Sequence, residues 1–331
     1  MRIVVTGATG NAGSALVRAF RGSGVEVVGL ARRLPETSGA PFDEADWVAC
    51  DLLADDADRV LRSVLHGADA VVHLAWAVQP GRDDQPMRRA NRVGTSRVLR
   101  AVAAAGVPHL VCCSSVAAYA PAGNRAVDER WPCEGIPGSN YSEDKVWLER
   151  TLAGFAPSGT SVAVVRPGTI LQPAAAGEFG RWLLGPVLTR VLRRRWPVPL
   201  PFWAGLRGQV VHADDLAAAF RSIVDRRATG AFNIAAAPVL TAPDVAEAFG
   251  AVPLQLPKRV VTTAARASGR LGLHRLHPGW LAVADQVVLM DTRRARSTLD
   301  WRPRHDAIAA LRSVVDGLVR GSGQATAPLA A

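Results

Sequence analysis

Lysine is almost absent from this chain of 331 residues, although lysine and arginine together number 39 and the formal net charge is +10. Lys145 and Lys258 are the two lysines, and all the other basic residues of that set are arginines. The densest arginine run, residues 193–195, is short. A nucleic-acid-binding surface would gather basic residues on one face, often with aromatic side chains. The composition therefore argues against nucleic acid as a partner.

Cysteine and long apolar stretches are also scarce. The four cysteines form no C-x-x-C pair and have no histidine at metal-ligand spacing, so we expect buried thiols and no metal site. No stretch of about 18 uncharged apolar residues occurs, so no membrane span is expected. The first residues, MRIVVTGATG, have the pattern of a strand and not of a signal peptide. These absences predict a cytoplasmic protein.

Strand-like and helix-like segments alternate through the first half of the chain. Apolar runs of strand length occur at 2–6, 25–31, 47–50, 70–75, 109–114 and 161–166. Helical spacing occurs at 14–22, 55–65, 87–105 and 141–152. Apolar strands that alternate with helices are typical of a parallel sheet covered on both faces. The sequence thus predicts an α/β fold with a doubly wound Rossmann sheet.

The pattern changes after residue 171. Several prolines lie in residues 172–208, and residues 238–305 are loosely patterned, whereas 209–212 and 231–234 resemble late strands that return to the first lobe. We therefore expect a Rossmann domain and a small, interleaved C-terminal substrate lobe, followed by a disordered tail. The Rossmann domain would comprise 1–171 and 209–237, the substrate lobe 172–208 and 238–320, and the tail 321–331.

A glycine-rich turn follows the first predicted strand. Gly7, Gly10 and Gly13 have the spacing G-x-x-G-x-x-G, with Asn11 and Ala12 between the last two. Small residues in such a turn let backbone N–H groups approach a pyrophosphate at the positive end of a helix. The position of the turn between a strand and a helix indicates a dinucleotide site.

The residues after the second predicted strand bear on the choice of dinucleotide. An acidic residue there would bind the adenine ribose of NAD, and a basic residue would accept the 2′-phosphate of NADP. Arg32 and Arg33 occupy these positions. We therefore expect NADP, with NAD as the alternative if both arginines only face solvent.

Tyr141 and Lys145 lie four residues apart on a predicted helix, so both side chains share one face. A nearby ammonium favours the phenolate and lowers the pKa of a tyrosine, which can then exchange a proton with a substrate oxygen. Ser115 follows a predicted strand, and ligands of doubly wound sheets bind at such strand ends. A hydroxyl there can bond the reacting oxygen. These residues are the candidate catalytic group.

With these pieces in order, the chain resembles the extended short-chain dehydrogenase/reductase family, in its NAD-dependent epimerase/dehydratase group. The resemblance runs along nearly the whole chain. It rests on these segments: TGATGNAG at 6–13, Asp51-Leu52, His73-Leu74-Ala75, NRVGT at 91–95, Ser115, Tyr141 with Lys145, Arg166-Pro167-Gly168, VHADDLA at 211–217, Asp291-Thr292, and Leu299-Asp300-Trp301.

The resemblance implies a role for each matched residue. Tyr141 would be the acid/base and Ser115 would hold the substrate oxygen, while Lys145 would tune Tyr141 and bind the nicotinamide ribose. The dinucleotide would contact Gly7, Gly10, Asn11, Ala12, Gly13, Arg32, Arg33, Asp51, Leu52, Leu74, Ala75, Asn91, Tyr141, Lys145, Pro167 and Ile170. A small-molecule substrate and a homodimer are also implied.

Departures from the family pattern narrow the range of reactions that we expect. Val116 and Ala117 stand where sugar 4,6-dehydratases of the family carry Asp-Glu, which makes that elimination unexpected. Arginines that meet a nucleotide diphosphate in the epimerases are displaced or missing: Arg207 lies five residues before His212 instead of four. Arg190 and the 193–195 run are possible substitutes, although a solvated helix face explains them as well.

Three functions remain open from the sequence. The first is a reductase or dehydrogenase for a small, non-nucleotide substrate, in a pocket lined by Trp182, Leu183, Trp203 and Trp280, which could equally be plain core. The second is a nucleotide-sugar epimerase. The third is a non-catalytic NADP-binding sensor, which the presence of Ser115, Tyr141 and Lys145 disfavours.

Overall fold

The computed structural model describes residues 1–36, 39–78, 84–181, 189–190, 199–270, 278–323 and 329. Trp182, Leu183 and the 193–195 run lie outside the described residues. Within the described part, no helix has the length and apolar character needed to cross a bilayer.

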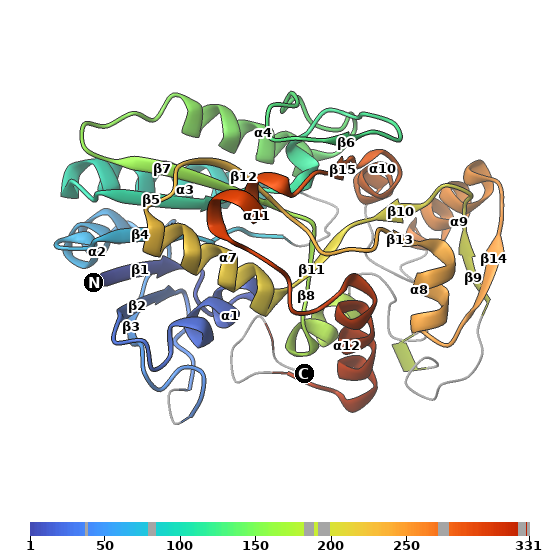
Figure 1. The fold of residues 1–331 in the computed structure, drawn as a ribbon, viewed down its shortest axis with the longest axis horizontal. Helices are drawn as coiled ribbons and strands as arrows, with labels where there is room; N and C mark the ends of the chain where they lie inside the picture. The colour runs from blue at the N-terminus through green and yellow to red at the C-terminus, as the bar shows by residue number, and fades with distance from the viewer. Residues whose placement is uncertain are drawn as a thin grey trace.

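Seven parallel strands form the central sheet, in the order β12-β7-β5-β4-β1-β2-β3 (Figure 1). The strands are β1 (Arg2–Thr6), β2 (Glu26–Ala31), β3 (Asp46–Ala49), β4 (Ala70–His73), β5 (His109–Cys113), β7 (Ser161–Pro167) and β12 (Gly230–Ile234). The chain runs outward from β1 to β3 and then returns past β1 to β4, so the strand order reverses between β1 and β4. Ligands bind at such a reversal, beyond the carboxyl ends of the strands.

Helices cover both faces of the sheet (Figure 1). One face carries α1 (Asn11–Phe20), α7 (Ala213–Arg226) and α11 (Arg293–Leu299), and the other carries α2 (Ala57–Leu65), α3 (Gln85–Ala105) and α4 (Asn140–Ala153). Successive residues of β1 serve opposite cores: Ile3 and Val5 pack with α1 and α7, whereas Val4 packs with α2 and α3. The predicted doubly wound α/β fold is confirmed, with strand ends within two residues of those expected.

The remaining elements are short. Paired strands outside the central sheet are β6 (Ala126–Val127) with β15 (Leu289–Met290), β8 (Thr169–Leu171) with β11 (Val210–His212), β9 (Pro199–Phe202) with β14 (Val252–Gln255), and β10 (Arg207–Gly208) with β13 (Leu240–Thr241). The helices are η1 (Val116–Ala118), η2 (Pro173–Ala175), α5 (Ala176–Phe179), α8 (Ala242–Ala248), α9 (Lys258–Arg270), α10 (Pro278–Gln286) and α12 (Ala307–Arg320). Figure 1 shows α8, α9, β9 and β14 at the end of the molecule away from β1–β3.

The two strands predicted at 209–212 and 231–234 pair with different partners. β12 joins the central sheet beside β7, as its seventh strand. β11 instead pairs with β8 outside the sheet, because the chain leaves β7 through the turn at Gly168, whose amide donates to Ile234. α11 also packs back on the sheet, against α7 and β12.

Candidate functional site

The glycine turn between β1 and α1 is packed too closely for a side chain at two of its glycines, Gly7 and Gly13. Gly7 has a φ of +70°, and a Cβ there would lie 2.7 Å from the amide nitrogen of Ala75. A Cβ on Gly13 would lie 2.2 Å from the carbonyl oxygen of Gly7. The turn is therefore pressed against the end of β4 on one side and against α1 on the other. This is the close backbone packing that a dinucleotide-binding turn requires.

Side chains tie this turn to β8. The amide of Asn11 donates to the carbonyl oxygen of Ile170 over 3.0 Å. The amide of Gln172 donates to the carbonyl oxygen of Asn11 over 2.7 Å and to Ser14 over 3.2 Å. The structure thus brings the predicted residues Asn11 and Ile170 together. No sequence pattern had pointed to Gln172.

The residues expected near the adenine end follow β2 and β3, which are neighbours in the sheet. Arg32 and Arg33 are exposed and make no ion pair within the described residues. Asp51 is exposed and accepts a hydrogen bond from the amide of Leu53. Leu52 packs against Gly94 on α3. Arg32 and Arg33 are thus solvent-exposed cations beyond the carboxyl end of β2.

The segment after β4 carries Leu74 and Ala75 and is fixed from both sides. The amide of Ala75 donates to the hydroxyl of Thr6 over 3.2 Å. The side chain of Asn91, on α3, accepts from the amide of Ala77 over 2.7 Å and donates to its carbonyl oxygen over 3.1 Å. Asn91 is buried and therefore holds this segment in place. Its expected contact with a dinucleotide stays a prediction.

The structure brings Ser115, Tyr141 and Lys145 together at the end of β5. Ser115 follows the strand and caps η1, and Tyr141 and Lys145 lie in the first two turns of α4. The Ser115 hydroxyl lies near enough to the Tyr141 phenol to lower its pKa. The ammonium of Lys145 donates to the carbonyl oxygen of Cys113 over 2.9 Å and lies 5.9 Å from the centre of the Tyr141 ring. Pro167, at the end of β7, lies on the adjacent strand.

Burial controls the protonation of this group. The lowered pKa that the sequence predicted for Tyr141 is wrong, because burial raises the pKa of Tyr141 to about 12. A hydrogen bond with Ser115 acts in the opposite direction. Burial lowers the pKa of Lys145 to about 8. At neutral pH the tyrosine is therefore a neutral phenol, and most of the lysine carries its proton. Such a pair can donate a proton to a substrate oxygen and stabilise the phenolate that remains.

Trp280 and Trp76 lie beside Tyr141 and Lys145, respectively. Trp280, on α10, lies against Tyr141 with the ring centres 4.7 Å apart and the ring planes tilted by 31°. Its expected place in the lining of a substrate pocket stays a prediction. Trp203 is 6 % exposed. Trp76 is a further residue of the site that was not predicted from the sequence, and its ring centre lies 3.7 Å from the ammonium of Lys145. Its position could have indicated it, because Trp76 directly follows Ala75 at the end of a strand that was predicted to border the site.

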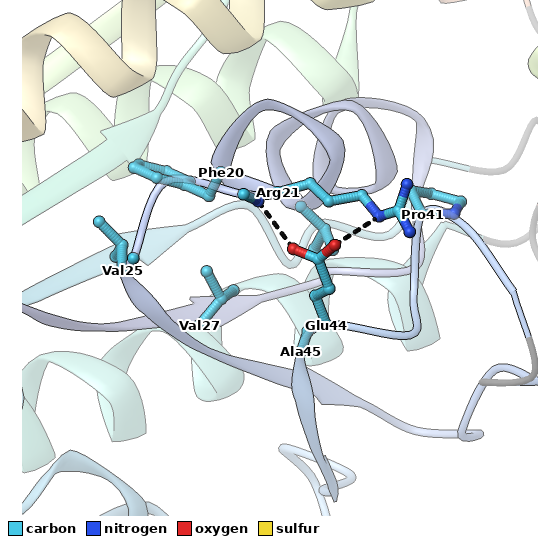
Figure 2. A pocket seen from close by; sticks show the side chains of 10 residues that line it. Phe20, Arg21, Val25, Val27, Pro41, Glu44 and Ala45 are labelled. Atoms are coloured by element: carbon cyan, nitrogen blue, oxygen red, sulfur yellow. Dashed lines mark hydrogen bonds and ion pairs between the residues drawn. The ribbon is translucent and has the colours of Figure 1, made fainter.

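A small pocket with a cavity volume of about 140 Å³ lies elsewhere, between the end of α1 and the start of β2 (Figure 2). Its apolar wall includes Phe20, Val25 and Val27. The carboxylate of Glu44 forms an ion pair with Arg21 and accepts a hydrogen bond from the amide of Gly22. This pocket is at the amino-terminal end of β2. The candidate catalytic group is at the carboxyl ends of the strands and is therefore separate from it.

The architecture and the strand-end residues define a Rossmann-type enzyme fold, and comparison with known proteins identifies the family. The chain belongs to the NAD dependent epimerase/dehydratase family, whose model matches residues 3–235.

Individual relatives differ in the substrates that their names state. The chain is 33% identical to 3-diazoavenalumate denitrifying reductase of Streptomyces sp, over 92% of this chain and 97% of the relative. It is 27% identical to dTDP-6-deoxy-L-talose 4-dehydrogenase (NAD(P)(+)) of Kitasatospora kifunensis, over 99% and 97%. Among solved structures, dTDP-glucose 4,6-dehydratase from Streptomyces venezuelae with NAD and TYD bound matches with a TM-score of 0.73 and 21% identity, over 96% of each chain.

Proposed function

We propose that this protein is an NADP-dependent reductase or dehydrogenase that acts at an alcohol or carbonyl carbon of a small, non-nucleotide substrate. The observation that carries the proposal is the convergence of Ser115, Tyr141 and Lys145 at the end of β5. Strand β4 separates this group from the glycine turn after β1, so one dinucleotide can span both.

The residues present fit a bound dinucleotide. Gly7 and Gly13 leave no room for a side chain, and the turn between them offers backbone N–H groups at the start of α1. Lys145 is the group for the nicotinamide ribose, and Arg32 and Arg33 are the groups for a 2′-phosphate. When bound, the dinucleotide supplies or accepts the hydride.

The roles of the side chains follow from their protonation. In the direction of reduction, the Tyr141 phenol donates its proton to the carbonyl oxygen as that oxygen gains charge. The Ser115 hydroxyl donates a hydrogen bond to the same oxygen and holds it. The Lys145 ammonium stabilises the phenolate that forms. In the direction of oxidation, the same groups act in reverse.

The class of substrate is proposed from the walls of the site and from one relative. Trp280 presents an aromatic ring against Tyr141, and the sequence lacks the usual pattern of arginines for a diphosphate. The relative named 3-diazoavenalumate denitrifying reductase matches nearly the whole chain. We therefore take a small aromatic compound as the first substrate class to test.

Tyr141→Phe tests the catalytic assignment. We expect turnover to fall by about 10²–10⁴-fold because the proton donor is lost, while NADPH still binds. NADPH oxidation with cinnamaldehyde, a small aromatic aldehyde, as the probe measures this turnover. Tyr119, the other tyrosine of the chain, supplies the control: its hydroxyl bonds Asn233 and Arg166, so Tyr119→Phe should lower stability and leave turnover nearly unchanged. Unchanged turnover in Tyr141→Phe would refute the assignment.

Titration with both dinucleotides tests the cofactor. We expect NADP to bind more tightly than NAD, and the double change Arg32→Ala with Arg33→Ala to weaken NADP at least about tenfold through lost charge-assisted hydrogen bonds. Arg62→Ala, on the exposed side of α2, is the control. Equal affinity for NAD and NADP in the unaltered protein would contradict the preference for NADP.

Nucleotide-sugar epimerisation is the second candidate. The family description names epimerases, and the chain is similar over 99% of its length to a relative named as a dehydrogenase of a dTDP-sugar. An epimerase returns the hydride to its substrate and retains its dinucleotide, whereas a reductase must exchange it. Purification of the protein with a nearly stoichiometric dinucleotide, together with turnover of UDP-glucose, would favour the epimerase over the reductase.

A further inference from the structure

Trp76 lies on a backbone segment that is held at both of its neighbours. The amide of Ala75 donates to Thr6 on β1, and both polar atoms of the Ala77 backbone bond the side chain of Asn91 on α3. The indole packs against the core formed by α2, α3 and α4. Because its neighbours are fixed in this way, Trp76 has little freedom to move away from the end of β4.

The face of this indole meets the ammonium of Lys145. The nitrogen lies 3.7 Å from the ring centre, well inside the range of about 6 Å over which a cation is attracted to an aromatic face. Lys145 is 2 % exposed, and its ammonium donates to the carbonyl oxygen of Cys113. It makes no ion pair within the described residues. Its charge is therefore met by two dipolar groups, a carbonyl and a ring.

We propose that Trp76 is a positioning residue for the reaction: its indole face holds the Lys145 ammonium beside Tyr141 and keeps it charged in a buried site. This inference rests on the role proposed above for Lys145. Nothing in the family pattern described above assigns a function to this tryptophan.

The titratable groups that face Lys145 are Cys112 and Cys113 on β5, His73 on β4, and Tyr141, Asp144 and Glu149 on α4. Desolvation lowers the pKa of Lys145, whereas the carboxylates of α4 act to raise it. An aromatic face favours the charged form of the lysine and so, like the carboxylates, acts to raise the pKa of Lys145. Removal of the ring should therefore lower the pKa of Lys145 further while all the other groups stay in place.

The scarcity of lysine makes a direct measurement possible. Protein labelled with ¹³C at the lysine ε-carbon has two signals, from Lys145 and from the exposed Lys258, and Lys258→Arg assigns them. Protons held over an aromatic ring resonate upfield, so the Lys145 signal should lie upfield of the Lys258 signal. In Trp76→Leu we expect that signal to move toward the position of Lys258 and the pKa of Lys145 to fall by about one pH unit.

A matched variant tests for a general packing effect. Trp147 lies on α4 beside the same core, and its ring faces Arg92 instead of Lys145. Trp147→Leu should leave the Lys145 signal and its pKa unchanged. If Trp76→Leu does not fold, Trp76→Phe keeps a smaller ring and should give an intermediate shift. Equal spectra and titrations for the position-76 and position-147 variants would overturn the proposal.

The titration also separates this proposal from the proposed function. The lysine signals report the position and charge of Lys145 whether or not the protein turns over a substrate. If Tyr141→Phe keeps full activity while Trp76→Leu shows the expected lysine shifts, the proposed reaction is refuted and the role of Trp76 stands. If the lysine signals in Trp76→Leu match those of the unaltered protein while Tyr141→Phe is inactive, the role of Trp76 is refuted and the proposed reaction stands.

Discussion

Lys145 illustrates how a single buried charge is accommodated at the residue scale. The two carboxylates nearest to it on α4 are already paired, Asp144 with Arg88 and Arg92, and Glu149 with Arg166. The ammonium therefore relies on the Cys113 carbonyl and the Trp76 ring. Such an arrangement favours function over stability, because burial of a cation without a carboxylate partner is costly.

Lys145→Met should stabilise the protein at neutral pH. Burial lowers the pKa of Lys145 from 10.5 to about 8, so below about pH 8 the folded protein must bury a charged group. Each pKa unit corresponds to about 1.4 kcal/mol, and the lost carbonyl and ring contacts offset part of the gain, so we expect about 1–3 kcal/mol at pH 7.

The stability gained by Lys145→Met should depend on pH. Between pH 8 and 10.5 the unfolded chain binds more protons at Lys145 than the folded protein does, so the stability of the unaltered protein rises there and the advantage of the variant fades. Urea unfolding at pH 7 and pH 10 measures both differences. Lys258→Met, at an exposed lysine, should change little. A variant that is less stable at pH 7 would disprove the prediction.

At the scale of elements, the turn between β1 and α1 shows why glycine is required at particular positions. The amide of Gly7 donates to Leu30 on β2, and its α-carbon approaches the backbone of Ala75 beyond β4. The turn thus contacts both strands that flank β1. A side chain there would have to displace backbone and not a flexible side chain.

Two glycine substitutions separate the steric effect from the backbone effect. Gly7 and Gly22 have φ values of +70° and +67°, but a Cβ on Gly22 meets nothing within 4 Å. Both alanine variants bear the cost of a left-handed backbone, about 1–2 kcal/mol. Gly7→Ala should lose about 1–3 kcal/mol more through the clash with Ala75, and its affinity for NADP should fall. Equal losses in urea unfolding would show that the turn relaxes without cost.

At the scale of the whole molecule, Asp215 fastens the C-terminal segment to α7. Its carboxylate is 1 % exposed and accepts hydrogen bonds from the amides of Arg304 and His305 and from the ring of His305. Its carbonyl oxygen accepts from the Trp301 indole. The segment continues into α12, which packs against α5 and α8. His212, at the start of α7, caps that helix and stacks on His305, which agrees with a structural role.

Asp215→Asn should therefore loosen the attachment of α12. An amide group cannot accept on both sides, so at least one buried amide loses its partner, at a cost of about 2–4 kcal/mol. Asp214, the preceding residue, is the control: its side chain is 45% exposed and pairs with Arg18, so Asp214→Asn should cost less than about 1 kcal/mol. Circular dichroism during urea unfolding measures both, and equal losses would argue against this role for Asp215.

The sequence by itself determined the order of the elements and the local chemistry of the site. Strand and helix periods are short-range signals, so the central strands lie within two residues of their expected positions. The helix spacing of Tyr141 and Lys145 likewise required no tertiary information. α1 begins earlier than expected, at Asn11, because the helix starts inside the glycine turn.

Only the tertiary structure decided which side chains meet across the strand ends. The contact of Trp76 with Lys145, the contact of Trp280 with Tyr141 and the attachment of β11 to β8 all join residues that are far apart in the chain. Periodicity shows which face of an element is apolar, but it does not show which distant side chain packs there. That choice is made by the packing of strands and helices into layers, so the setting of the predicted catalytic residues emerged only from the fold.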